Sequence, residues 1–170
     1  MLVCFSVFLN ITMAVLCVWS FNLHGFNEGH FYLADLCASQ DVIMIQEHWL
    51  LEQDVHKLSN VHNDYVCIAS SPMGNASTKG VLKGRPFGGI GVLINKHYAH
   101  LLQCIKIEEQ FVIVKLGSTL LINVYFPVCK DKVSHETEIV DLLMMIEQVI
   151  ETSDAKQAII GGDFNFDLTS

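Results

Sequence analysis

The sequence contains few charged residues and no pair of cysteines with the spacing of a structural metal site. Charged residues make up 16% of the 170 residues, below the usual value of about a quarter for a soluble domain. The six cysteines include no Cys-x-x-Cys, and most lie in apolar runs, where cysteine packs as a small hydrophobic residue. We therefore predict free thiols in place of a disulfide framework, and no zinc site.

The N-terminus lacks the basic residues of a signal peptide, because no lysine or arginine precedes Lys57. The apolar residues 1–19 are only marginally long for a membrane anchor, and a polar triplet from Asn10 to Thr12 interrupts them. The competing interpretation is a buried strand over 14–21 that ends at Asn22. We favour the strand, and therefore expect an intracellular location, with the nucleus as one option, over secretion. We expect no stable membrane association.

Residues 1–12 are then an apolar N-terminal extension, and the domain covers 13–170 with Met13 as an alternative start. Mass spectrometry should find a terminal peptide that begins at residue 13 or 14. A peptide that begins near Asn22 would indicate secretion instead, since cleavage there removes the predicted strand.

The apolar residues that are present suffice for one domain with a large core. They make up 51% of the chain, the mean hydropathy is +0.39 and the net charge is −8, which argues against a protein that grips nucleic acid over its whole surface. Residues 65–107 nevertheless contain no acidic residue and five of the ten basic ones. Lys79, Lys83 and Arg85 therefore lie either in a nucleic-acid-binding loop or in an ordinary solvated loop.

Apolar runs rich in valine, isoleucine and leucine predict a layered α/β domain. Several are nearly continuous, as in strands that are buried on both faces. The runs cover 14–21, 41–46, 65–69, 89–94, 110–116, 119–125 and 157–161. Gly117-Ser118 predicts a two-residue hairpin loop. Helical periodicity covers His30–Ser39 and Ser134–Glu151, with Ser134 as a candidate N-cap of the longer helix, and residues 70–88 predict an exposed loop.

Polar side chains follow several of these runs, where a sheet can present ligands at one edge. Asn22 and Glu47 offer an amide and a carboxylate oxygen, of the kind that Mg²⁺ binds. Tyr125 offers a hydroxyl to a phosphate. Asp163 and Asn165 are two apart, so in extended chain they share a side and could orient a water. Each residue alone is equally typical of a turn that ends a strand.

Five segments together resemble the endonuclease/exonuclease/phosphatase superfamily, and within it most of all the apurinic-type endonuclease domain of non-LTR retrotransposons. The segments are Trp19–Gly25, Ile45–Leu50, Gly88–Ile94, Asn123–Pro127 and Gly161–Asn165. The resemblance implies a four-layered α/β sandwich of two mixed sheets flanked by helices. It also implies Mg²⁺-dependent hydrolysis of phosphodiesters, here as a DNA-nicking endonuclease, with Mn²⁺ as an alternative ion.

The resemblance assigns roles to particular residues. Glu47 would bind Mg²⁺, with Asn22 near the ion and the scissile phosphate. Tyr125 would contact that phosphate. Asp163 would activate or orient the attacking water, and Asn165 would help to position both. The basic residues Lys79, Lys83 and Arg85 would contact DNA phosphates, and a reverse transcriptase could follow in a longer product.

The sequence departs from the family in two places. His24 stands where some relatives have an acidic residue near the metal. The Ser-Asp-His segment that closes the family's site does not occur before Ser170, so we expect the C-terminal part of the fold to be missing and this chain to have little or no activity. The alternatives are a non-catalytic module that binds nucleic acid or protein, and a lipid or inositol phosphatase or a deadenylase, which share the Asn, Glu and Asp-x-Asn elements.

Overall fold

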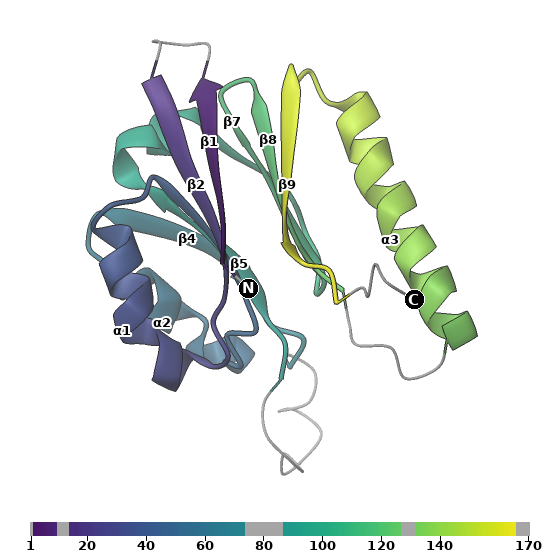
Figure 1. Cartoon of the computed structure of the whole chain (residues 1–170), viewed down its shortest axis with the longest axis horizontal. Helices are drawn as coiled ribbons and strands as arrows, with labels where there is room; N and C mark the ends of the chain where they lie inside the picture. The colour runs from purple at the N-terminus through teal and green to yellow at the C-terminus, as the bar shows by residue number, and fades with distance from the viewer. Residues whose placement is uncertain (1, 10–13, 74–86, 127–131, 166–170) are drawn as a thin grey trace.

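Two β-sheets pack face to face, and helices cover their outer sides, in the computed structural model of the chain (Figure 1). The structure describes residues 2–9, 14–73, 87–126 and 132–165. Helices α1 and α2 lie on the outer side of the first sheet, and α3 lies on the outer side of the second. This is the predicted four-layered α/β sandwich.

The first sheet contains five strands in the order β1-β2-β3-β5-β4. They are β1 Leu2–Leu9, β2 Ala14–Asn22, β3 Val42–Gln46, β4 Tyr65–Ser70 and β5 Ile90–Asn95. Its helical segments are α1 Phe26–Cys37, α2 His56–Ser59 and the short 3₁₀ turns Glu52–Asp54 and Lys96–Leu101. Strands β2 and β3 run parallel and the other pairs are antiparallel, so the sheet is mixed.

The second sheet contains four strands in the order β6-β7-β8-β9. They are β6 Leu102–Ile107, β7 Phe111–Leu116, β8 Thr119–Tyr125 and β9 Gln157–Asp163, and α3 spans Lys132–Thr152. The β7–β8 hairpin turns at the predicted Gly117-Ser118. Strands β8 and β9 run parallel, because α3 provides the crossover between them.

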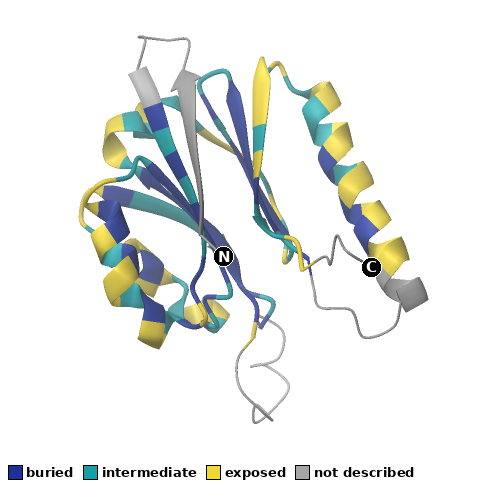
Figure 2. Ribbon diagram, in the orientation of Figure 1, coloured by how far each residue is buried: buried dark blue, intermediate teal, exposed yellow. Residues whose placement is uncertain are grey.

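Apolar side chains form one core layer between the sheets and one beneath the helices on each side (Figure 2). All five residues of β3 are buried, and so are the first six of β8. A strand with both faces covered consists mostly of apolar residues, which accounts for the nearly continuous hydrophobic runs in the sequence. The sheets are therefore held together over the length of their central strands.

Several sequence-based expectations need correction. The apolar run 157–161 predicts a buried strand, but in β9 Ala158 is exposed and Ile160 is 42% exposed, because β9 is the edge strand of its sheet in the described part of the chain. The long helix begins at Lys132, so Ser134 is not its N-cap. The shorter helix begins at Phe26, not at His30, and residues 102–107 form the strand β6, which the apolar runs did not predict.

Residues 2–9 of the predicted N-terminal extension form β1, which pairs antiparallel with β2. The predicted strand over 14–21 is confirmed as β2, and it ends at Asn22. The start at Met13 and the cellular location stay predictions. Among the helices of the described residues, none is both long and apolar enough to cross a membrane.

Candidate active site

Four strands, two from each sheet, end at one rim, and a polar side chain lies at or just past the end of each. Asn22 is the last residue of β2, and Glu47 directly follows β3. Tyr125 and Asp163 are the last residues of β8 and β9, and they face each other in the register of that parallel pair. Because carboxyl ends of parallel strands lie together, this rim is where an α/β sheet typically binds its ligands.

A hydrogen bond joins the two sheets at this rim. The Asn22 Nδ2 donates to Asp163 Oδ2 over 2.7 Å, although the two residues lie 141 positions apart. The amide oxygen of Asn22, Oδ1, accepts from the backbone N–H of His24 at 3.1 Å. Asn22 is buried at 7% exposure, so its amide orientation is fixed, and it holds the carboxylate of Asp163 in place.

The turn after β9 differs from the extended chain that the sequence suggested. Asn165 has a φ of 42°, and its backbone N–H donates to Asp163 Oδ1 at 3.2 Å, as in an Asx turn. Its side-chain Nδ2 donates to the carbonyl of Phe126 at 2.8 Å. Asn165 therefore orients Asp163 through its backbone, while its side chain ties this turn to the end of β8.

Glu47 and Tyr125 complete the cluster. The Tyr125 hydroxyl hydrogen-bonds to the Glu47 carboxylate, and burial, together with the nearby charges of Glu47 and Asp163, raises the pKa of Tyr125 to about 12. Tyr125 thus keeps its proton at neutral pH and can donate it in a hydrogen bond. The Glu47 Oε2 also lies 3.5 Å from Nδ1 of the exposed His24.

A buried polar network lies directly below Glu47 and crosses between the sheets. Gln46 Nε2 donates to Asn123 Oδ1 at 2.6 Å and to Ser20 Oγ at 3.2 Å. Asn123 Nδ2 in turn donates to the carbonyls of Ile45 and Gly91 at 2.9 and 2.8 Å. These three side chains have no role predicted from the sequence, although polar residues inside apolar runs are a signal that could have identified them.

The loop after β3 is held in an uncommon conformation. Glu47 and Trp49 have φ values of 54° and 53°, in the left-handed region that side chains other than glycine seldom adopt. Between them His48 is fully buried. Its Nε2 donates to the carbonyl of Ser70 at 3.0 Å, and its Nδ1 accepts from the N–H of Leu50 at 3.0 Å.

His48 also fills the space that a side chain at position 89 would need. A Cβ on Gly89 would lie 2.3 Å from the His48 Cε1, and Gly89 has a φ of 91°. Burial lowers the pKa of His48 to about 4, so the ring is neutral at physiological pH. The imidazole therefore acts as a structural anchor that ties the loop after Glu47 to the end of β4.

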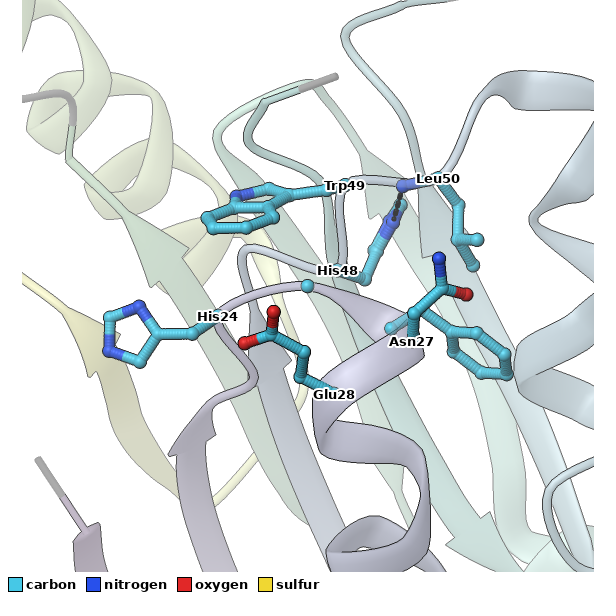
Figure 3. A pocket seen from close by; sticks show the side chains of 8 residues that line it. His24, Asn27, Glu28, His48, Trp49 and Leu50 are labelled. Carbon is cyan, nitrogen blue, oxygen red and sulfur yellow. Dashed lines mark hydrogen bonds between the residues drawn. The ribbon is translucent and has the colours of Figure 1, made fainter. Parts of the chain in front are cut away.

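A pocket of about 300 Å³ opens beside the cluster (Figure 3). It lies between the loop that follows β2 and the loop that follows β3, which are joined by backbone hydrogen bonds from Gly25 and Phe26 to Glu47 and His48. It is lined by His24, Gly25, Phe26, Asn27, Glu28, His48, Trp49 and Leu50. Through His24 the pocket borders the carboxylate of Glu47.

The donor atoms of the cluster suit a hard cation. Glu47 and Asp163 supply carboxylates and Asn22 supplies an amide oxygen with one lone pair still open. Within the described residues no three histidine, cysteine, aspartate or glutamate side chains gather around one point. Mg²⁺ needs only one or two carboxylates, since it keeps several of its waters, so this oxygen-rich set fits Mg²⁺ or Mn²⁺ better than zinc.

The structure thus brings together four of the residues that the sequence pointed to, Asn22, Glu47, Tyr125 and Asp163, with Asn165 at their edge. Lys79, Lys83 and Arg85, predicted to contact DNA, lie outside the described residues. Cys17, Cys37, Cys67 and Cys104 are free thiols, as predicted.

Solved structures with the same fold include enzymes that process DNA. The 3′ phosphatase NExo from Neisseria, solved with a product DNA hairpin, superposes with a TM-score of 0.66 at 12% identity, over 88% of this chain and 57% of that one. An AP endonuclease from Archaeoglobus fulgidus superposes with a TM-score of 0.61 at 14% identity, over 88% of this chain and 57% of that one. TDP2 from D. rerio, solved with a single-strand DNA product, gives 0.56 at 18% identity, over 89% and 61%.

No family model and no curated protein matches the sequence. The chain spans 57% of the length of the NExo and AP endonuclease chains. At these identities the likeness concerns the fold, and the layer order and strand topology agree with it. The chain has the fold of the endonuclease/exonuclease/phosphatase superfamily.

Proposed function

We propose that the cluster at the strand ends is the site of a divalent-cation-dependent phosphodiesterase that nicks DNA. The observation that carries this proposal is the hydrogen bond between Asn22 and Asp163 across the two sheets. It places a fixed carboxylate beside the Glu47 and Tyr125 pair. In-line attack on a phosphodiester needs an oriented nucleophile, a group that contacts the phosphate and a positive charge near it. Asp163 and Tyr125 would meet the first two needs, and the carboxylates of the cluster would hold a cation that meets the third.

Each protein group would have a distinct task. Asp163 would orient the attacking water through a carboxylate oxygen, because its two oxygens are already fixed by Asn22 and by the Asn165 N–H. Tyr125, which stays protonated, would donate its hydroxyl to a phosphate oxygen. Because Asn22 is buried, its amide and the Asp163 carboxylate that it binds are held in one orientation. Little reorganisation is therefore needed when a substrate binds.

Glu47 would hold the cation, with the Asn22 Oδ1 as a second oxygen ligand. Bound Mg²⁺ would supply positive charge against the negative charge that develops on the phosphate. The buried His48 and the Gln46–Asn123 hydrogen bond fix the backbone next to Glu47, so the carboxylate is presented at one place on the rim.

Two observations favour DNA as the substrate. The similar structures include proteins solved with a DNA hairpin product and with a single-strand DNA product. The basic residues Lys79, Lys83 and Arg85 belong to a stretch without acidic residues, suited to phosphate contacts that give position and not sequence choice. The sequence segment Gln46-Glu47-His48-Trp49 favours the retrotransposon type of endonuclease. For that type we also propose fusion to a reverse transcriptase in a longer product.

The test is a nicking assay on supercoiled plasmid with Mg²⁺. Any nicking by the full chain should be lost in Glu47→Ala and in Asp163→Ala, and it should survive in Glu108→Ala, a surface carboxylate paired with Lys106 on the second sheet. Activity that persists in both site variants would contradict the assignment. DNA binding without nicking would favour the non-catalytic module, and release of phosphate from inositol phosphates but not from DNA would favour the phosphatase alternative.

A further inference from the structure

The pocket beside the cluster has an aromatic wall, Trp49, that the proposed chemistry does not use. The indole of Trp49 lies on one side of the pocket, and the carboxylate of Glu28 lies on the opposite side (Figure 3). The pocket volume of about 300 Å³ is at the low end for a small-ligand site, roughly 300 to 1,000 Å³. It therefore suits one planar ring system and excludes a stretch of duplex.

The backbone holds the indole in this position at a conformational cost. Trp49 has a φ of 53°, and its N–H donates to the carbonyl of Gly88 at 2.9 Å. The neighbouring His48 is anchored through both ring nitrogens. A Cβ at Gly25 would lie 2.6 Å from the Trp49 Cε3, so only glycine there lets the indole lie across the start of α1. Strained residues that the surrounding structure enforces are concentrated at functional sites.

The polar lining favours a neutral ligand with hydrogen-bond donors over a phosphate. Glu28 and Asn27 are both exposed, and the Glu28 carboxylate can accept a hydrogen bond from an amino group while it repels an anion. Phe26 and Leu50 complete the apolar part of the lining. An aromatic wall, apolar surroundings and one carboxylate acceptor match the chemistry of a nucleobase with an exocyclic amine.

We propose that this pocket binds one unpaired nucleobase of the strand whose phosphate occupies the cluster. The inference rests on the proposed function and adds a subsite to it. His24 belongs to the pocket and lies 3.5 Å from the Glu47 carboxylate, so a base in the pocket belongs to a nucleotide next to the scissile phosphate. A base that stacks on Trp49 must have a free face, which bases inside a duplex lack.

The experiment measures binding of short fluorescent oligonucleotides to the full chain in EDTA, where no cleavage occurs. A single-stranded DNA tetramer is compared with a tetramer of the same phosphates that carries no bases. Trp49→Ala should weaken binding of the base-bearing tetramer by about tenfold, the loss expected of one stacked base, and leave the abasic tetramer unchanged. Trp49→Phe should restore most of the affinity. Phe31→Ala, a 74% exposed aromatic of α1 outside the pocket, should change neither.

A second measurement avoids a variant at position 49. In Trp19→Phe, Trp49 is the only tryptophan, and its emission should be quenched by the base-bearing tetramer and not by the abasic one. Equal quenching by both, or equal weakening of both by Trp49→Ala, would overturn the proposal and make Trp49 a packing residue. Absence of nicking by the wild-type chain would count against the proposed function alone, since base-dependent quenching needs no cleavage.

Discussion

Replacing Asn123 by leucine tests whether the polar network below Glu47 holds the two sheets in register. Asn123 is fully buried and makes three side-chain hydrogen bonds, one from Gln46 and two to the carbonyls of Ile45 and Gly91. Leucine has a similar size but cannot hydrogen-bond, so those partners are left in the core. At about 1 kcal/mol for each lost bond, the free energy of unfolding should fall by about 3 kcal/mol, and the midpoint of thermal unfolding by roughly 6 to 12 °C.

Urea unfolding followed by circular dichroism measures this loss. Asn60→Leu, at an exposed position, is the matched control and should change stability by less than about 0.5 kcal/mol. In a double-mutant cycle, Asn123→Leu with Gln46→Leu should cost less than the sum of the single changes by about 1 kcal/mol, because both remove the same hydrogen bond. A loss below about 1 kcal/mol for Asn123→Leu, or strict additivity in the cycle, would refute the reasoning.

Three further predictions concern the site. Burial lowers the pKa of His48 from 6.5 to about 4, so the unfolded chain is protonated first on acidification. The free energy of unfolding should keep its full value above pH 6.5 and fall by up to about 3 kcal/mol towards pH 4. Denaturation curves of His48→Gln should lack this pH dependence. Gly89→Ala should lower the free energy of unfolding by more than about 2 kcal/mol, because the new Cβ would clash with His48 and an alanine is strained at this φ. Thermal unfolding measures the loss, and an unchanged midpoint would contradict this packing. Tyr125→Phe should lower any nicking rate by about a hundredfold. In the wild type the nicking rate should not fall between pH 8 and 10 through ionisation of Tyr125, because its pKa is raised to about 12.

The strands that the sequence predicted are those whose burial leaves a simple pattern. β3 and β8 are covered on both faces and read as apolar runs. In β6, by contrast, Gln103 and Cys104 are exposed and Lys106 interrupts the run, so no hydrophobic pattern marked it as a strand. The exposure of β9 was not predictable either, because its apolar residues are the same whether or not a neighbouring strand covers them.

The residues of the candidate site were found because each lies at or just past the end of an apolar run, as Asn22, Glu47, Tyr125 and Asp163 all do. The sequence could not show that Asn22 bonds to Asp163, since the two lie in different sheets. Nor could it show the turn at Asn165 or the pocket under Trp49, which depend on left-handed backbone angles at residues other than glycine. Such angles are set by tertiary contacts and have no signature in local sequence.

Binding of Mn²⁺ to the purified chain tests most directly whether the strand ends form a cation site. Isothermal titration should show one Mn²⁺ per chain for the wild type and for Glu108→Gln, and a loss of affinity of at least about tenfold for Glu47→Gln, which removes the carboxylate that we assign to the ion. Absence of binding by the wild type, or equal affinity in Glu47→Gln, would contradict the account.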